Sequence, residues 1–392
     1  GIHPTSVPEI VLKDPNIDFV CVGEGEEAIV DLANALERGD RAFNIPNIWY
    51  RKPDGTIVKN SMRNLIENLD ELPSPDKDIF YKKIPDIQGY TLMTERGCLF
   101  RCTYCHNSFM TELYKGKGKY LRRRTVKNVI EELRMAERNY NKPFYIFDDD
   151  IFTYDSEWLS LFAGIYADEI GKPTFAWVEP NTITPEIVDD LVRMKCFAVE
   201  MGVQSINEQY RQKVLKRFSS NRKIKEAIHL LKNNGIGVIV DNIWGCPGET
   251  VQDLEELIDF YNENRPSKIN IFFLRYYPRL EIIKESGLNN EQIKNLEEGY
   301  DLFPFVLYRK NEITKEKEKL LNMVPLIQLF PKSVIRLFLY RKYYRFFPKI
   351  IFFHMEVLIF TFTRMFKKNI RRYLRSHPSR YLIFIFRKLA NR

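Results

Sequence analysis

Short apolar runs alternate with amphipathic stretches over the middle of the chain. The runs are rich in β-branched and aromatic residues, as expected for buried strands. The stretches between them place apolar residues three or four positions apart, which is typical of helices packed on a sheet. This alternation predicts parallel βα units and therefore an α/β fold. The predicted strands are Tyr90–Met93, Phe144–Phe147, Thr174–Val178, Ala198–Met201, Gly237–Ile243 and Lys268–Phe273.

Polar residues mark where the helices between these runs begin. Asp155 precedes an apolar stripe and can cap a helix, and Thr184 with Pro185 opens a second helix in the same way. Thr250 and Asp253 form a capping-box pattern ahead of a third. Six such units are too few to close the eight-stranded barrel that parallel βα repeats commonly form.

One stretch between the first two runs, Glu95–His106, carries three cysteines. Cys98, Cys102 and Cys105 follow the pattern Cys-x3-Cys-x2-Cys. Thiolates are soft ligands suited to iron–sulfur clusters or zinc. An ordinary cluster takes four cysteines, so three leave one metal position open for chemistry. The alternative is structural zinc with His106 as the fourth ligand, but adjacent Cys105 and His106 would struggle to reach neighbouring tetrahedral vertices.

The three cysteines, with aromatic Tyr104 between the last two, resemble the signature of the radical S-adenosylmethionine (SAM) superfamily. The resemblance implies that the cysteines hold a [4Fe-4S] cluster whose fourth iron is chelated by SAM. An electron, supplied by a donor such as flavodoxin or ferredoxin, then cleaves SAM to methionine and a 5′-deoxyadenosyl radical. It also implies that the six βα units form a partial (β/α)6, TIM-like barrel over roughly Tyr90–Glu281.

The resemblance also assigns SAM contacts to residues at the carboxyl ends of the strands, where the sites of parallel βα folds lie. Glu179 would bind the SAM amino group, and Arg217 would pair with its carboxylate through a planar guanidinium. Gln204 and Asp241 would hold the ribose hydroxyls. The other expected contacts are Tyr104 and Ser205, together with Gly245, Pro247 and Gly248, whose backbone would shape the adenine site.

Three adjacent acids, Asp148, Asp149 and Asp150, directly follow the second apolar run. Adjacent carboxylates repel one another and must be solvated, paired with cations or bound to a ligand. The superfamily usually has Gly-Gly-Glu here, so the resemblance implies that one or more of these acids meets the positive charges of SAM. Alternatively, the acids cap the following loop or pair with Arg96 or Arg101.

Residues 1–75 have the pattern of a separate α/β piece, with a strand at Ile17–Val22, a helix after it and a strand pair around Pro53–Gly55. Gly1–Thr5 and Val22–Glu26 resemble the second half of a Rossmann-like cobalamin-binding domain of the kind fused to radical SAM cores. The cobalt-ligating Asp-x-His-x2-Gly loop does not occur in the sequence, so cobalamin is not an expected ligand of these residues alone. Glu24 and Glu26 are expected to cap the helix that follows. Because the chain begins with Gly, we expect it to be a fragment or a processed product.

The charge of the chain is unevenly distributed. The net charge is +8, yet residues 325–392 contain 16 Lys/Arg and one acid, and the remainder has 44 basic and 51 acidic residues. We therefore divide the chain into residues 1–75, a core at 76–290 and a helical, basic and aromatic extension at 291–392. Its most apolar window, residues 350–363, is shorter than the roughly 20 residues of a membrane span. Basic residues beside aromatics fit a membrane surface, a helical cap on the barrel, or RNA.

Six cysteines without a secretory signal indicate a reducing cytoplasm, with peripheral contact at the inner face of the membrane if the extension binds lipid. The function predicted from these features is a radical SAM enzyme acting on a small-molecule substrate, such as a methyltransferase for an apolar or lipid-like compound. An RNA-modifying radical enzyme and a non-catalytic iron–sulfur or zinc protein are the alternatives.

Overall fold

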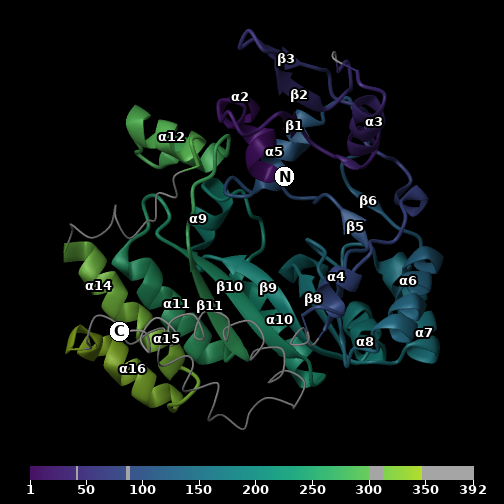
Figure 1. Cartoon of the computed structure of the whole chain (residues 1–392). Coiled ribbons are helices and arrows are strands. Elements are labelled where there is room, and N and C mark those ends of the chain that lie inside the picture. Colours follow the sequence, from purple (N-terminus) through teal and green to yellow (C-terminus); the bar gives the residue numbers. More distant parts are fainter. Residues whose placement is uncertain (41–42, 85–88, 300–311, 347–392) are drawn as a thin grey trace.

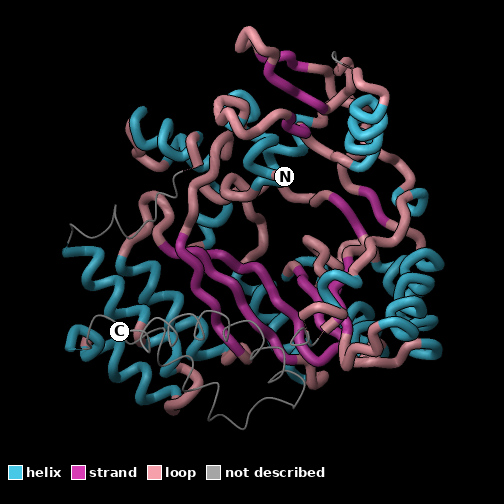
Figure 2. Tube along the Cα trace, in the orientation of Figure 1, coloured by secondary structure: helices cyan, strands magenta, loops and turns pink. Residues whose placement is uncertain are grey.

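The computed structural model describes residues 1–40, 43–84, 89–299 and 312–346 (Figures 1 and 2). Its centre is a six-stranded parallel sheet with the order β11-β10-β9-β8-β7-β4, so strands successive in the barrel are neighbours. The end strands β4 and β11 each pair on one side only within the described residues, and the partial (β/α)6 barrel is confirmed. Its strands are β4 (Tyr90–Leu92), β7 (Tyr145–Phe147), β8 (Thr174–Val178), β9 (Cys196–Gln204), β10 (Gly237–Trp244) and β11 (Lys268–Phe273).

The helices between the strands begin where the capping pattern predicts. The side chains of Asp155 and Thr184 accept from backbone amides of the first helical turns, and Thr250 and Asp253 form a complete capping box. These helices are α6 (Val126–Asn139), α7 (Ser156–Glu169), α8 (Pro185–Arg193), α9 (Glu208–Lys213), α10 (Asn221–Asn233) and α11 (Val251–Asn264), with a 3-10 turn η2 (Pro180–Thr182).

Side chains of the barrel strands alternate between an outer and an inner face. On β7, Tyr145 and Phe147 belong to the main core under the helices, whereas Ile146 belongs to a smaller inner cluster with Phe175 and Ile239. The same alternation continues toward the carboxyl ends of the strands. The inward positions there are polar: Asp148, Glu179, Glu200, Gln204, Asp241 and Asn270.

The N-terminal segment (residues 1–75) forms a three-stranded antiparallel sheet of β1 (Phe19–Cys21), β2 (Ile48–Arg51) and β3 (Ile57–Lys59). The expected strand pair around Pro53–Gly55 is therefore confirmed as β2 and β3. The helical elements before the barrel are α1 (Ile2–Ser6), α2 (Pro8–Val11), α3 (Glu26–Glu37), η1 (Leu69–Glu71) and α4 (Asp78–Tyr81). That this segment is half of a cobalamin-binding domain stays a prediction.

Helices of the C-terminal extension pack on the outside of the barrel, beside α11 (Figure 1). After η3 (Glu281–Glu285) and α12 (Asn290–Glu297), the layer comprises α14 (Glu312–Leu321), α15 (Met323–Leu326), α16 (Lys332–Tyr340) and η4 (Tyr343–Phe346). Met323, Ile327, Ile335 and Tyr344 are fully buried members of the main core. The part of the basic extension up to Phe346 is thus an integral layer of the fold, whereas residues 347–392, with the apolar window at 350–363, lie outside the described residues.

No helix within the described ranges has the length and apolar character needed to cross a membrane.

Ending the chain at Val324 should destabilise the protein strongly compared with ending it at Phe346. The shorter chain loses Ile327, Ile335 and Tyr344, and each fully buried large apolar side chain contributes about 1.5–3 kcal/mol. Thermal unfolding followed by circular dichroism would check this. Equal midpoints for the chain ending at Val324 and the full-length chain would show that the layer does not contribute to the core.

Candidate functional site

The three cysteines lie between β5 (Glu95–Arg96) and α5 (His106–Leu113), in a segment we call the cysteine segment (Cys98–Cys105). Cys102 is buried, Cys98 and Cys105 are half-buried, and all three are free thiols. Gly97 leads into the segment with φ of 93°, and a Cβ there would lie 2.5 Å from the Tyr120 carbonyl oxygen. The turn into the cysteines therefore requires glycine.

Hydrogen-bond donors approach two of the sulfurs. The Phe100 amide lies 3.5 Å from Cys98 Sγ, and Arg217 Nη1 lies 3.8 Å from Cys102 Sγ. Burial raises the pKa of Cys98 to about 12 and that of Cys105 to about 11, so the thiolates need a cation to stabilise them. Soft thiolates with N–H donors around their sulfurs fit an iron–sulfur cluster.

In the part of the chain that the structure describes, no three Cys, His, Asp or Glu side chains are grouped so that they could hold a single metal ion. A four-iron cluster binds each thiolate through a different iron, so its ligands need not converge on one point.

The three acids after β7 have different surroundings. Asp149 is buried, and its carboxylate accepts from the Thr94 amide at 2.6 Å, the Thr94 hydroxyl at 2.6 Å and the Glu95 amide at 3.0 Å. Its side chain thus holds the backbone before the cysteine segment, and its contact with SAM stays a prediction. Asp148 and Asp150 are more exposed, and Asp150 accepts from Asn107 on α5 at 2.9 Å.

Burial raises the pKa of Asp148, and the carboxylates of Asp150 and Glu200 raise it further. A nearby cation would relieve this repulsion. Asp148 is also at an inward position of β7, so it is the acid of this group best placed for a positively charged ligand.

Arg217 connects the cysteine segment with the strand ends. Its Nη2 donates to the Gly202 carbonyl at 2.7 Å and lies 3.8 Å from Glu179 Oε1, while Nη1 faces Cys102. Its Nε is buried without a hydrogen-bond partner among the described residues. A buried guanidinium with an unused donor is suited to an anionic ligand beside Cys102.

Glu179 is buried and already bonded within the protein. Its carboxylate accepts from the Asn181 amide at 2.7 Å, from Asn181 Nδ2 at 3.2 Å and from the Ser219 hydroxyl. The first of these bonds caps η2. A carboxylate has about four acceptor positions, so a contact with a ligand amine remains chemically feasible.

Gln204 and Asp241 are brought together, as predicted, on neighbouring strands. Both line one cavity, and Asp241 Oδ1 accepts from Asn270 Nδ2 at 2.9 Å. Asn270 Nδ2 also lies 3.3 Å from Glu200 Oε1. Burial raises the pKa of Asp241 well above its usual range, and the Glu200 carboxylate adds to the rise. Asp241 can therefore keep its proton and offer a donor as well as an acceptor.

Gly245 and Pro247 lie in the turn after β10. Gly245 has φ of 81°, and its amide donates to Glu249 Oε2 at 2.9 Å. The Pro247 carbonyl accepts from the Tyr210 hydroxyl at 2.7 Å. Lys317 of α14 bonds the Glu249 carbonyl and lies 3.8 Å from its carboxylate, so the C-terminal layer helps to fix this turn. The sequence offered no local signal for Lys317, which lies 68 residues from Glu249.

Ser205 is not among the residues that line the cavity; its carbonyl accepts from Arg211. Its contact with SAM stays a prediction.

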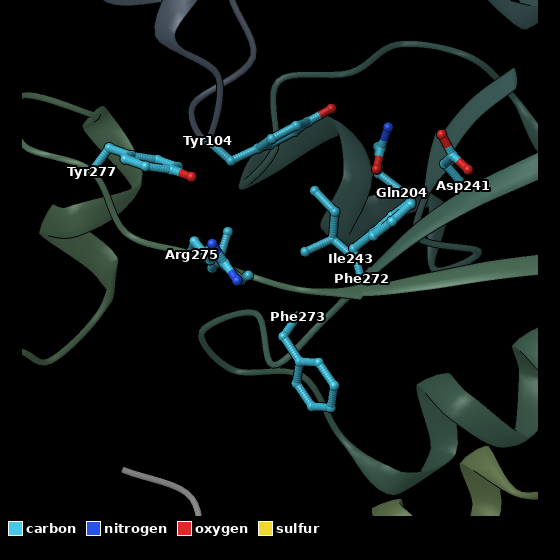
Figure 3. A pocket seen from close by; sticks show the side chains of 9 residues that line it. Tyr104, Gln204, Asp241, Ile243, Phe272, Phe273, Arg275 and Tyr277 are labelled. Atoms are coloured by element: carbon cyan, nitrogen blue, oxygen red, sulfur yellow. The ribbon is translucent and has the colours of Figure 1, made fainter. Parts of the chain in front are cut away.

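A cavity of about 280 Å³ is lined by the strand-end residues and by a group we call the wall residues, Phe272 of β11 with Arg275 and Tyr277 of the loop that follows (Figure 3). Gln204, Asp241 and Ile243 stand near Phe272, and Tyr104, Arg275 and Tyr277 face them from the other side. Phe272 and Tyr277 are 51% and 47% exposed. The wall residues Phe272, Arg275 and Tyr277 were missed at the sequence level, although the aromatic run at the end of the last strand was a signal.

Comparison with known proteins agrees with an iron–sulfur site at the cysteine segment. A family model described as "Radical SAM superfamily" matches residues 93–261. An "uncharacterized methyltransferase" of Pyrococcus horikoshii is 26% identical over 86% of this chain and 73% of its own length. The anaerobic magnesium-protoporphyrin IX monomethyl ester cyclase of Rubrivivax gelatinosus is 27% identical over 73% of this chain and 52% of its own length.

Among solved structures, the radical SAM methyltransferase TsrM of Kitasatospora setae, with cobalamin and a [4Fe-4S] cluster bound, matches with a TM-score of 0.59. The match has 16% identity and covers 72% of this chain and 56% of TsrM, so it shows a shared fold. The chain spans about half the length of two of these three proteins. From the family match, the cysteine segment and the open parallel barrel together, we conclude that residues 93–261 form a radical SAM domain.

Proposed function

We propose that the chain is a methyltransferase-type radical SAM enzyme that modifies an apolar substrate. The observation that carries the proposal is the position of Arg217, whose guanidinium faces Cys102 on one side and Glu179 on the other. When bound by Cys98, Cys102 and Cys105, a [4Fe-4S] cluster supplies the electron that cleaves SAM to methionine and a 5′-deoxyadenosyl radical.

The residues around the cysteines can hold SAM in the required place. Arg217 pairs with the SAM carboxylate through the donor that is otherwise unused. Glu179 and Asp148 offer carboxylates to the ammonium and sulfonium charges. Gln204 and Asp241 bind the ribose hydroxyls, and the raised pKa of Asp241 allows its carboxyl group to donate. Each of these contacts is a proposal that the geometry supports.

The wall beyond the SAM residues suits an apolar substrate. Phe272 and Tyr277 offer aromatic surface that stays half-exposed, and Arg275 stands between the barrel and Tyr277 in the same cavity (Figure 3). Aromatic side chains bind flat or aliphatic groups mainly through buried apolar area. The similar proteins include a methyltransferase of Pyrococcus horikoshii and a cyclase of Rubrivivax gelatinosus, which supports methyl transfer as the first reaction to test and ring formation as the second.

A reductant is also required, and we propose a flavodoxin or a ferredoxin as the donor. Cobalamin is bound by TsrM, and we propose no step through it for this chain, because the cobalt-ligating motif is not among its residues.

Anaerobic reconstitution should give about four irons per chain, as expected for one four-iron cluster. Cys102→Ala should abolish iron binding, because it removes the buried ligand of the three. Iron and zinc analysis with the visible absorption spectrum would check this. Zinc near one per chain without iron–sulfur absorption would overturn the cluster and favour the alternative of a zinc protein.

Arg217→Ala and Asp241→Ala should each weaken SAM binding while leaving the iron content unchanged. Hydrogen bonds to charged groups contribute about 1.5–3 kcal/mol, which corresponds to roughly ten- to hundredfold in affinity. Equilibrium dialysis with labelled SAM would measure the effect, and Arg222→Ala is the control because Arg222 is an exposed arginine paired only with Glu226 on its own helix face. If both site variants bind SAM as the control does, the proposed contacts are wrong.

We also propose that the basic extension contacts an anionic membrane surface. From Leu329 to Phe346 the sequence holds five Lys/Arg and no acid, and Tyr340 and Phe346 are 91% and 84% exposed. Aromatic and basic residues together favour the interface of a bilayer, where each basic residue contributes about 1 kcal/mol.

The full chain should float with vesicles containing phosphatidylserine, and the chain ending at Phe346 should bind them more weakly because it lacks 11 of the 16 basic residues. Binding should fall as salt rises, since exposed charges are screened over about 8–10 Å at physiological ionic strength. An RNA shift assay run in parallel gives the competing outcome: RNA binding without flotation would contradict the membrane proposal.

A further inference from the structure

The loop Gly23–Glu26 of the N-terminal segment contacts residues that flank the cysteine segment. Helix α3 begins at Glu26 with Gly25 at its N-cap, and no side chain caps it by a hydrogen bond. The expectation that Glu24 caps this helix is therefore wrong. Its carboxylate points instead to arginines of the barrel, 72 and 98 residues away in the sequence.

Glu24 binds two arginines from the strands next to the cysteine segment. Arg122 of β6 (Arg122–Arg123) donates through Nη2 at 2.6 Å and through Nη1 at 3.2 Å, and Arg96 of β5 donates through Nη1 at 3.2 Å. Arg96 also pairs with Glu26 at 2.6 Å. The Arg122 side chain is only 4% exposed, so its buried positive charge needs the Glu24 carboxylate as a partner.

The same loop also contacts the residue that follows α5, the helix after the cysteine segment. The Glu24 amide donates to the Tyr114 hydroxyl at 2.5 Å, and Tyr114 directly follows α5, the helix that begins after Cys105. Gly23 has φ of 90°, and a Cβ there would lie 2.0 Å from that hydroxyl oxygen. The loop thus contacts the elements on both sides of the three cysteines.

The middle of the cysteine segment is anchored to the barrel by other bonds. The Thr103 hydroxyl donates to the Val214 carbonyl at 2.7 Å, and the Ile282 amide donates to the Thr103 carbonyl at 3.0 Å. At the entrance to the segment, Arg96 is separated from Cys98 only by Gly97. Gly97 is held in a tight turn with φ of 93° close to the Tyr120 carbonyl, so the position of Cys98 follows that of Arg96.

We propose that Glu24 is a positioning residue for the cluster, and that it acts through Arg96 and Arg122 to fix the β5–β6 strand pair at the entrance to the cysteine segment. The N-terminal segment is then a structural part of the cluster site. The inference rests on the proposed function only in that the three cysteines hold a cluster. It assigns a role to Glu24 whatever the substrate is.

The test compares Glu24→Gln with Glu27→Gln in the reconstituted full-length protein. Glutamine keeps the size of the side chain but cannot neutralise two guanidinium groups. Glu27 is the matched control, because it lies three residues away and pairs with Arg63 at the surface of the same segment. Arg96→Gln is a second variant that leaves the buried pair of Glu24 and Arg122 in place, and Glu24→Asp keeps the charge with a shorter reach.

Three measurements separate positioning from general stability: the electron paramagnetic resonance spectrum of the reduced cluster with and without SAM, amide hydrogen exchange over residues 97–106, and the KM for SAM. Glu24→Gln and Arg96→Gln should alter the spectrum, speed exchange in this segment and weaken SAM use about ten- to hundredfold, the range for residues that orient metal ligands. In all three measurements, Glu24→Asp should give values between those of the two glutamine variants and the wild type. Glu27→Gln should give the values of the wild type.

The outcomes distinguish this inference from the proposed function. If the wild type holds no iron, the proposed function fails and this inference fails with it. Suppose instead that the wild type holds a cluster. If Arg96→Gln and Glu24→Gln then have the same spectrum and the same amide exchange rates as the wild type, only the positioning role is overturned. If Glu24→Gln does not fold, Arg96→Gln decides the question alone, and an unchanged spectrum and exchange in that variant contradicts the proposal.

Discussion

The proposed site depends on one buried charge, the guanidinium of Arg217. Burying an unpaired cation is costly, and removing the partner of a buried ion is more costly than the pair is favourable. Here the compensation comes from the Gly202 carbonyl, the carboxylate of Glu179 and the sulfur of Cys102. Since these groups belong to three different parts of the chain, the guanidinium holds the cysteine segment in register with the strand ends. Its Nε is buried without a partner among the described residues, so it is suited to donate to an anion beside the cysteines.

The strand-level part of this arrangement follows from the sequence. Apolar runs located the six strands, polar residues after these runs located the candidate site, and capping residues located the starts of the helices. The different surroundings of the three acids do not follow from this pattern, because Asp149 bonds to Thr94 and Glu95, which lie 55 and 54 residues earlier in the chain.

Other parts of the site could not be predicted, because their partners are far apart in the chain. Nothing near Glu24 indicates that it binds Arg122, and nothing near Lys317 indicates that it holds the turn at Glu249. A charged residue at a loop or on a helix face is usually solvated, so sequence patterns favour capping or exposure for both. Only the tertiary fold reveals that the N-terminal segment and the C-terminal layer each touch the site. The N-terminal segment contacts the barrel at Arg96 and Arg122, and the C-terminal layer contacts it at the turn after β10.

The most direct test of the central claim is reductive cleavage of SAM by the reconstituted protein. Under anaerobic conditions with dithionite, and without any substrate, the protein should convert SAM to methionine and 5′-deoxyadenosine in equal amounts, measured by liquid chromatography and mass spectrometry. Cys102→Ala is the control and should give neither product. A preparation that contains its full complement of iron and binds SAM, yet forms no 5′-deoxyadenosine on reduction, would contradict the proposed radical chemistry.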